Sequence, residues 1–417
     1  MPLSVTFGAL AERRFRLLFG ARTVSTLGSS MAEIALAFAV LDLGSPRDLG
    51  FVILAREIPI VVLLLLGGVW GDRLPRHLVL VGSDTVRGAA QGLCAVLLLT
   101  GNATVLWIAL LQVVFGGASA FGRPAFQGLV PQTVAVERLQ QANALLGLSQ
   151  STVAIAGPAL GAIIVAAANP GWALAADAVT FGVSALLLLR ISLPRTLRMT
   201  AASVLSDFRD GWREFVSRRW VVVMVVGFGV FQLTYFPALL VLGPYVAKTE
   251  LGGAGAWGTI LAVEALGSLV GGLFALRLRA RRPLVATLVV VVPAAVQLML
   301  LGVGAPLWLL TGVAFVSGVG FAYGGAVWFA TLQEKIPEHA ISRISSFDWF
   351  GSVALNPIGY ALIGPLSEAI GVGESLVLAG VVNLASTFAM LAVPSVRALE
   401  AGPERHAAPA VGPGANL

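Results

Sequence analysis

The chain has 417 residues, of which 57% are hydrophobic and 12% are charged, and its mean hydropathy is +0.90. A soluble fold could not bury that much apolar surface, so the composition excludes a soluble or disordered class and predicts an integral membrane protein. The net charge is +6. The basic residues lie between long apolar runs, which argues against nucleic-acid binding and for contact with the lipid bilayer.

Hydropathy read in windows of about 19 residues predicts twelve membrane-spanning helices. They lie at 17–42, 50–70, 77–100, 104–122, 142–168, 171–192, 220–246, 256–277, 283–303, 306–332, 345–367 and 372–394. The predicted fold is therefore an all-α membrane protein, with two pseudo-symmetric bundles of six transmembrane helices each.

The basic residues predict how the chain is oriented and divided. Most of the 27 Lys and Arg lie near the N-terminus, in alternate loops and in the tail, whereas the opposite loops hold Arg47 and Lys248. The positive-inside rule then predicts a multi-pass protein of the cell (inner) membrane with both termini cytoplasmic. We expect an N-terminal bundle at 1–192, a cytoplasmic linker at 193–219 with an interfacial helix at 203–215, a C-terminal bundle at 220–394 and a disordered tail at 395–417.

A polar turn between the second and third spans carries Gly68, Asp72, Arg73 and Arg76. The spacing G-x-x-x-D-R-x-x-R resembles the cytoplasmic loop motif of the major facilitator superfamily. The second half has a partial counterpart, which keeps the glycines and the basic cluster but has Leu276 where Asp72 stands. Parallel repeats of this kind are how many secondary transporters are built.

Further motifs extend the resemblance over nearly the whole chain. The stretch 139–145 (LQQANAL), Gly157-Pro158-x-x-Gly161 and Ile336-Pro337 are similar to the branch that contains macrolide and enterobactin exporters. The Gly-Pro pair resembles the antiporter motif of drug exporters, although Ala162 replaces a common glycine. The alternative interpretation is close helix packing with no coupling role, since glycine admits a neighbouring backbone and proline loosens its own helix.

The resemblance also implies a cytoplasmic gate. Its residues here are Gly68, Asp72, Arg73, Arg76, Asp84, Arg87 and Asp348. Asp72 would latch onto the N-terminus of the eleventh helix, which we expect to begin at Ser345 with Asp348 three residues on, in a capping-box pattern. Asp84 and Arg87, three residues apart, are expected to be structural partners of the Asp72-Arg73 pair.

Charges inside the spans are the sharpest functional signal, because an ionised group in hydrocarbon is costly unless it is paired or faces a cavity. Glu33, Arg56, Glu57, Asp177 and Glu264 all lie roughly 9 to 14 Å below the outer surface at 1.5 Å per residue. Glu33 and Arg56 share a depth, which predicts a salt bridge. Glu57 follows Arg56 by about 100° around the helix and is expected to face another partner.

Desolvation raises the pKa of a carboxyl group and a nearby cation lowers it. A carboxylate on which these two effects balance can exchange a proton as water reaches it from alternate sides. Glu33 is therefore the leading proton site, with Asp177 and Glu264 as alternates. Arg22 either meets an anionic substrate or extends its charged end to the membrane surface. The aromatic side chains expected at a hydrophobic cavity include Phe38, Tyr235, Phe236 and Tyr323.

Several classes of chemistry lack a pattern. The single Cys94 and the three histidines match no metal-binding spacing. A Gly-Lys-Ser/Thr phosphate loop is absent, which argues against direct ATP use. No nucleophile and base stand at a suggestive spacing, so the sequence predicts neither an enzyme nor a bound cofactor or metal.

Together these features predict a monomeric secondary transporter that exports a small amphipathic organic compound, such as a drug, natural product or siderophore. Proton antiport through alternating access would drive it, so the partners are the substrate, protons and the bilayer. Two alternatives stay open, namely proton-coupled uptake of a small solute and a non-transporting receptor or scaffold with the same fold.

Overall fold

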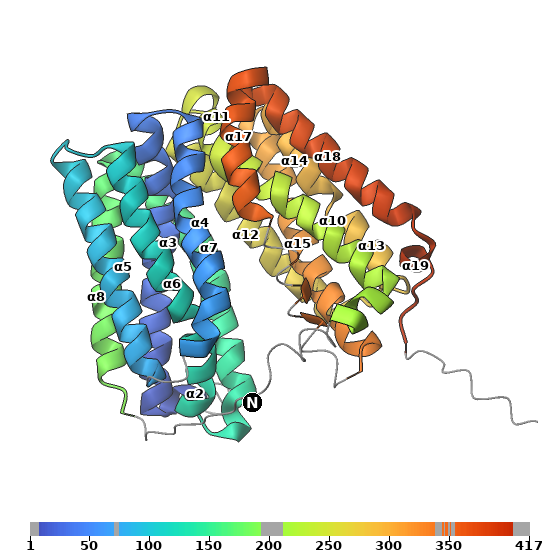
Figure 1. The fold of residues 1–417 in the computed structure, drawn as a ribbon, viewed down its shortest axis with the longest axis horizontal. Helices are drawn as coiled ribbons and strands as arrows, with labels where there is room; N and C mark the ends of the chain where they lie inside the picture. Colours follow the sequence, from blue (N-terminus) through green and yellow to red (C-terminus); the bar gives the residue numbers. More distant parts are fainter. Residues whose placement is uncertain are drawn as a thin grey trace, which may run out of the picture.

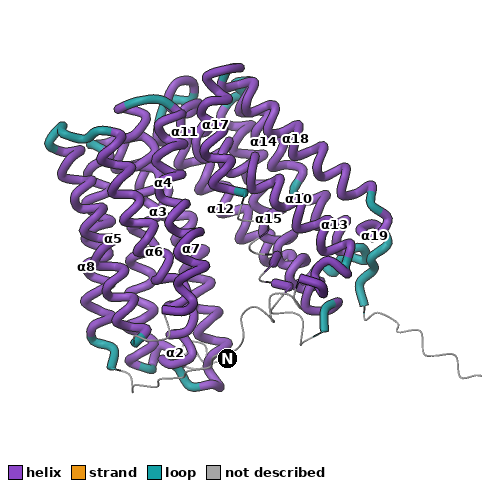
Figure 2. The backbone as a smooth tube through the Cα atoms, in the orientation of Figure 1, coloured by secondary structure: helices purple, strands orange, loops and turns teal. Residues whose placement is uncertain are grey.

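The computed structural model describes residues 8–70, 75–192, 212–337, 344–345, 347–348, 351 and 355–402. These residues form helices joined by short loops, and no strand occurs among them (Figure 2). Of the interfacial helix expected at 203–215, residues 203–211 lie outside the described residues, while 212–217 are helical. Within the described residues, every predicted span coincides with a helix or part of one; residues 346, 349–350 and 352–354 of the span at 345–367 lie outside them.

The N-terminal half is built from long helices joined by short loops. Its elements are α2 (Gly8–Ala11), α3 (Arg13–Leu43), α4 (Pro46–Trp70), α5 (Arg76–Leu99), α6 (Val105–Thr133), η1 (Val136–Arg138), α7 (Leu139–Ala167) and α8 (Pro170–Leu189). Two of the loops start their helices with side-chain caps. Thr104 accepts a hydrogen bond from the Trp107 amide before α6, and Asn169 accepts one from Gly171 before α8, where Pro170 takes the first turn.

The C-terminal half repeats this plan with more interruptions. Its elements are α10 (Arg219–Pro237), η2 (Ala238–Leu242), α11 (Gly243–Glu250), α12 (Ala254–Arg277), α13 (Pro283–Val290), α14 (Val292–Gly302), α15 (Leu307–Lys335), α17 (Asn356–Ile370), α18 (Val372–Ala392) and α19 (Pro394–Arg397). The segment expected as a tail thus begins with a short helix, α19. Within the described residues, nine helices or continuous helical runs are long and apolar enough to cross a membrane.

One of these runs, from Arg219 to Glu250, contains a wide turn. After Pro237, the residues Ala238 to Leu242 form a π-helical turn, η2, before α-helix resumes at Gly243. Proline lacks the backbone N–H that continues an α-helix, and π turns are often found where a helix is interrupted in this way.

The helices gather into two groups (Figure 1). In the first, α3 packs against α7 and α8, and α5 packs against α6 and α8. In the second, α12 packs against α15, and α18 packs against α14 and α10. The most extensive contacts between the groups are those of α7 with α12 and of α4 with α17, and α3 also contacts α11 and α12.

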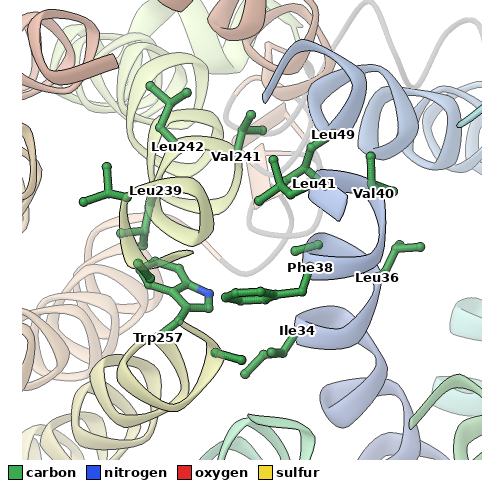
Figure 3. Packing of buried hydrophobic residues seen from close by; sticks show 14 of the residues in the cluster. Ile34, Leu36, Phe38, Val40, Leu41, Leu49, Leu239, Val241, Leu242 and Trp257 are labelled. Atoms are coloured by element: carbon green, nitrogen blue, oxygen red, sulfur yellow. The ribbon is translucent and has the colours of Figure 1, made fainter. Parts of the chain in front are cut away.

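We call the end of the molecule where α3 gives way to α4 the joined end. One hydrophobic cluster there draws buried residues from both halves, and Figure 3 shows the Phe38 ring of α3 directed toward Trp257 of α12. Two ion pairs cross at the rim. Lys248 Nζ lies 2.6 Å from Asp42 Oδ1, and Arg47 Nη1 lies 3.3 Å from Glu368 Oε2.

The opposite end, which carries the start of α3, is the separated end. Its hydrophobic clusters each belong to one half. Phe215, Trp220 and Trp328 pack among residues of the C-terminal half, and Leu18, Leu80 and Leu129 pack among residues of the N-terminal half. The helices of the two halves diverge toward this end (Figure 1).

Candidate functional site

A polar cavity of about 310 Å³ lies inside the N-terminal half. Helices α3 to α8 all contribute to its wall. The charged side chains that line it are Arg22, Glu33, Arg56, Asp84, Arg87 and Asp177. Charged groups at membrane depth usually face a partner or a cavity, and all six of these residues line this cavity.

Asp177 of α8 is fully buried in the cavity wall. Its Oδ2 accepts a hydrogen bond of 2.9 Å from Gln91 Nε2, and its Oδ1 accepts longer ones from Thr180 (3.4 Å) and Ser29 (3.5 Å). The facing residue on α3 is Gly28, where a Cβ atom would overlap Thr180 Oγ1 and Asp177 Oδ1. A glycine is therefore needed for α3 to approach this carboxyl group.

A second polar layer lies behind Asp177. Gln112 Nε2 of α6 donates a 3.1 Å hydrogen bond to Gln91 Oε1 of α5, and both glutamines are buried. The free thiol Cys94, three residues after Gln91 on α5, is also buried. Three helices of one bundle are thus linked through amide and carboxyl groups.

Arg87 of α5 is held between rings and an acid. Its guanidinium carbon lies 4.1 Å from the Phe181 ring centroid and 4.8 Å from that of Phe115, a cation–π arrangement. Its Nη1 lies 3.3 Å from Asp84 Oδ1, and Ser184 donates a 2.6 Å hydrogen bond to Asp84 Oδ2. Asp84 and Arg87 therefore pair with each other in the cavity wall.

Glu33 and Arg56 form the ion pair that their shared depth predicts, with 3.4 Å between Arg56 Nη2 and Glu33 Oε1. The expectation for Glu57 is wrong, because its Oε1 lies 3.6 Å from Nε of the same Arg56. A glutamate side chain is long enough to bend back to the guanidinium beside it, although the two Cα–Cβ bonds diverge. The Glu33 side chain is 61% exposed, far more than Asp177.

Arg22 lies nearer the separated end of the same cavity. Its guanidinium carbon is 4.8 Å from the Phe126 ring centroid. The side chain therefore faces the cavity interior instead of extending along the outside of the bundle.

Glu264 lies apart from these residues, in the C-terminal half. Gln297 Nε2 donates a 3.1 Å hydrogen bond to Glu264 Oε2, and the Tyr235 hydroxyl donates one of 3.3 Å to Gln297 Oε1. Tyr235 and Phe236 belong to an aromatic cluster with Phe231 and Phe321. The belt of five embedded charges expected from their depth is thus divided between the two halves.

The four aromatic residues expected at a cavity are all described, and none of them lines this one. Phe38 packs at the joined end, Tyr235 and Phe236 lie in the aromatic cluster, and the Tyr323 hydroxyl donates a 3.5 Å hydrogen bond to the Leu278 carbonyl. The phenyl rings in the wall are Phe115 and Phe126.

The motif Gly157-Pro158-x-x-Gly161 lies where α7 crosses two other helices. Gly157 and Gly161 leave no room for a Cβ atom against Ser30 and Met31 of α3. On its other side, α7 meets α12, where a Cβ at Gly258 would lie 3.0 Å from the Pro158 carbonyl oxygen. The motif therefore packs helices within its own half and between the halves.

The gate motif is described only in part. Gly68 lies in α4, while Asp72 and Arg73 lie outside the described residues. Arg76 Nη1 donates a 2.6 Å hydrogen bond to the Gly128 carbonyl. Asp348 Oδ2 accepts one of 3.2 Å from Trp328 Nε1. The contact of Asp72 with the N-terminus of the eleventh helix, and the partnership of Asp84 and Arg87 with Asp72 and Arg73, remain predictions.

Sequence reasoning missed the glutamines. Gln91, Gln112 and Gln297 each lie in a membrane-spanning helix and contact a carboxylate or another amide. Their signal was present, since embedded amides usually hydrogen-bond across helices. A search restricted to charged residues passes over them.

Two helical bundles and a charge-lined cavity at membrane depth define a multi-pass membrane transporter. Residues 18–354 match the Major Facilitator Superfamily, and the chain belongs to that family. This confirms the resemblance found in the sequence. The protein is accordingly a transporter of a small molecule and not an enzyme.

Two characterised relatives align along most of the chain. It is 26% identical over 407 residues to the multidrug efflux pump Tap of Mycolicibacterium fortuitum, covering 92% of this chain and 96% of that protein. It is 26% identical over 382 residues to the enterobactin exporter EntS of Escherichia coli O1:K1, covering 89% and 91%.

Solved structures share the fold at low identity. A bacterial homologue of the human lysosomal transporter Spinster, in an inward-facing and unoccupied conformation, has a TM-score of 0.71 at 15% identity and covers 92% of this chain and 97% of that one. A mutant of the nucleoside transporter NupG has a TM-score of 0.75 at 12% identity and covers 91% and 99%.

Proposed function

We propose that this protein exports a small amphipathic organic compound in exchange for protons, by alternating access. The observation that carries the proposal is Asp177, a fully buried carboxyl group in the wall of a polar cavity. An embedded acid with polar partners is a site at which a transporter can take up and release a proton. The efflux activity of Tap and EntS supports the outward direction.

The arrangement of the halves supports a state that is open toward the cytoplasm. The N-terminal helix α2 lies at the separated end (Figure 1), and the distribution of arginine assigns this end to the cytoplasm. The joined end then faces outward, sealed by the cluster around Phe38 and Trp257. A substrate would enter between the diverging halves.

Among the three candidate proton sites, burial favours Asp177 over the sequence-based choice of Glu33. Glu33 is largely exposed and lies in an ion pair with Arg56. Asp177 has hydroxyl and amide partners and no ion-pair contact within 4 Å among the described residues. Glu264 is embedded in a similar way but lies outside the cavity.

The cavity supports a substrate with both polar and aromatic or aliphatic parts. Its volume of about 310 Å³ is at the lower end of the range for small-molecule sites. Guanidinium groups lie over the phenyl rings of Phe115 and Phe126 in its wall. All the helices that line this cavity belong to one chain, so we propose that the monomer is the working unit.

Inside-out membrane vesicles with an acidified lumen test this function. Cells that produce the protein should yield vesicles that accumulate one or more of a panel of macrolides, lipophilic dyes and catechol siderophores. Asp177→Asn should reduce this accumulation to that of vesicles without the protein, because an amide cannot exchange a proton. Glu137→Gln, at an exposed site in η1, is the matched control and should retain it.

Two results would contradict the proposal. Full gradient-driven accumulation by Asp177→Asn would remove this carboxyl group from the coupling. Substrate loss from preloaded vesicles under the same gradient would indicate uptake into cells instead of export. Glu264→Gln, assayed in parallel, reports whether the C-terminal half contributes a second coupling site.

A further inference from the structure

Each half of the molecule presents one glutamine to an embedded carboxyl group, which is buried in the case of Asp177 and half-buried in the case of Glu264. Gln91 lies on α5, the third long helix of the N-terminal half, and donates to Asp177. Gln297 lies on α14, in the third span of the C-terminal half, and donates to Glu264. The two sites differ in what stands behind the glutamine, which is a second glutamine in the first case and a tyrosine hydroxyl in the other.

The N-terminal arrangement leaves one buried atom without a partner. Gln112 Nε2 donates to Gln91 Oε1, and Gln91 Nε2 donates to Asp177 Oδ2, so every donor in this row points toward the carboxyl group. Gln112 Oε1 is buried and accepts no hydrogen bond. A buried acceptor without a hydrogen bond is costly, so in a native protein it calls for an explanation, such as a functional role.

The amide N–H groups of Gln112 and Gln91 point toward Asp177, and this arrangement suits an ionised carboxyl group. A carboxylate only accepts hydrogen bonds, whereas a protonated carboxyl group also donates one. If Asp177 takes up a proton on Oδ2, that O–H meets the N–H of Gln91, and the two donors oppose each other. Rotation of the Gln91 amide about its last side-chain torsion removes the conflict, since Oε1 then accepts from Asp177.

Rotation of the Gln91 amide requires the Gln112 amide to rotate as well. The Gln91 amide nitrogen now faces Gln112, whose own nitrogen must turn away. When Gln112 also rotates, its previously unpartnered Oε1 accepts from Gln91 Nε2, so the reversed row satisfies this acceptor. In both states each amide keeps its own protons. The only covalent change is the O–H bond formed on Asp177 with a proton from the cavity water.

We propose that Gln91 and Gln112 form an amide relay that reverses direction when Asp177 gains or loses its proton. The relay transmits the protonation state of α8 through α5 to α6, a helix that lines the cavity and packs against α4. Gln91 and Gln112 are positioning residues, since they act through Asp177. The inference rests on the proposed role of Asp177 as a proton site.

The charged side chains near Asp177 do not replace Gln91 as its hydrogen-bond partner. From α5, Arg87 and Asp84 face the same region, but they pair with each other. From α3, Glu33 and Arg22 line the cavity, and from α4 Arg56 is paired with Glu33. Helix α7 carries no charged residue. The hydrogen-bonded neighbours that must respond to the proton are therefore the glutamine row and the hydroxyls of Ser29 and Thr180.

Infrared difference spectroscopy of the full-length protein in lipid nanodiscs tests the relay. The protein is labelled with glutamine carrying ¹³C at the side-chain carbonyl and titrated with acid. A carboxyl band that is lost in Asp177→Asn reports the proton on that residue. The relay predicts that a labelled amide band shifts at the same pH, because both Gln91 and Gln112 exchange hydrogen-bond partners.

Variants assign the amide signal. Gln91→Leu should abolish the pH-dependent amide change, and Gln112→Leu should leave a smaller change from Gln91 alone. Gln297→Leu is the matched control, with the same residue type in the other half, and should leave the change associated with Asp177 intact. The wild-type titration needs no variant, so poor folding of Gln91→Leu does not prevent the test.

The outcomes separate this inference from the proposed function. An Asp177 carboxyl band that titrates without any amide change would overturn the relay and leave the proton site standing. A carboxyl region that does not respond to Asp177→Asn would remove the proton site and the relay with it. An amide change that survives Gln91→Leu unchanged would assign the signal to other glutamines and also contradict the relay.

Discussion

The two ends of the molecule differ in whether the two halves share a hydrophobic cluster. At the joined end one hydrophobic cluster includes residues of both halves, and ion pairs cross at its rim. At the separated end each cluster belongs to a single half. A core shared by both halves resists their separation, whereas separate clusters let them move as rigid units.

This difference indicates which contacts keep the transporter in its present state. Opening the joined end must expose part of the shared cluster, while closing the separated end need not disturb the clusters already there. The polar cavity lies inside the N-terminal half between the two ends. Substitutions at the joined end should therefore shift the equilibrium between states, and equivalent ones at the separated end should affect stability alone.

Trp257→Ala should have the largest effect. Trp257 is 2% exposed and packs against Phe38 across the two halves. Truncating a buried Trp typically costs about 3–5 kcal/mol, here lost from the state in which the halves touch. Electron paramagnetic resonance distances between spin labels at positions 43 and 250 should gain a longer component.

Trp220→Ala is the control for this experiment, because Trp220 is also buried but lies in a cluster of the C-terminal half. It should lower thermal stability without lengthening the distance between the labels. Equal lengthening in both variants would show that the two ends do not differ in the way described above.

Gly258→Ala should have an intermediate effect. The added methyl group would press on Ala162 and lie 3.0 Å from the Pro158 carbonyl oxygen, where α12 crosses α7. Overpacking of this kind costs about 1–3 kcal/mol, so the same label pair should show a smaller long-distance component. Gly255→Ala, on the same helix with open space around it, should match the wild type. Identical behaviour of the two variants would mean that the crossing tolerates separation.

Loss of either rim ion pair, by Lys248→Gln or by Arg47→Gln, should have the smallest effects. The ion pair with Asp42 is partly exposed, and such pairs contribute about 0–1 kcal/mol. Lys248 also donates a 2.8 Å hydrogen bond to the Leu41 carbonyl, so its loss should exceed that of Arg47→Gln, whose pair with Glu368 is more exposed. Both effects should shrink in high salt. The reverse order, or no dependence on salt, would argue against a role for these pairs in closing the rim.

The positions of the helices could be predicted from sequence because apolar runs and polar turns are local properties. The ion pair of Glu33 with Arg56 also followed, since equal depth on consecutive helices limits the possible partners. The contact of Glu57 with Arg56 did not follow from the sequence, because helical angles describe where a side chain starts and not how far it can bend. The sequence therefore predicts the depth of an embedded side chain in the membrane better than the direction in which its charged end points.

The location of the cavity depends on packing that no single helix reveals. Asp177 and Glu264 are equally embedded in sequence, but one lines the cavity and the other contacts Gln297 beside an aromatic cluster. The same packing places Phe38 at the joined end instead of in the cavity wall. The roles of these residues remain predictions, whereas their neighbours are now defined.

The π turn η2 determines which side of α11 meets the N-terminal half. A turn that holds one residue more than an α-helical turn rotates everything after it by roughly 100° about the helix axis. Because of this rotation, Lys248 reaches the Leu41 carbonyl and Asp42. A regular α-helix through Ala238–Leu242 would turn that ammonium group toward a different neighbour. The rotation introduced at η2 thus aligns the rim of one half with that of the other.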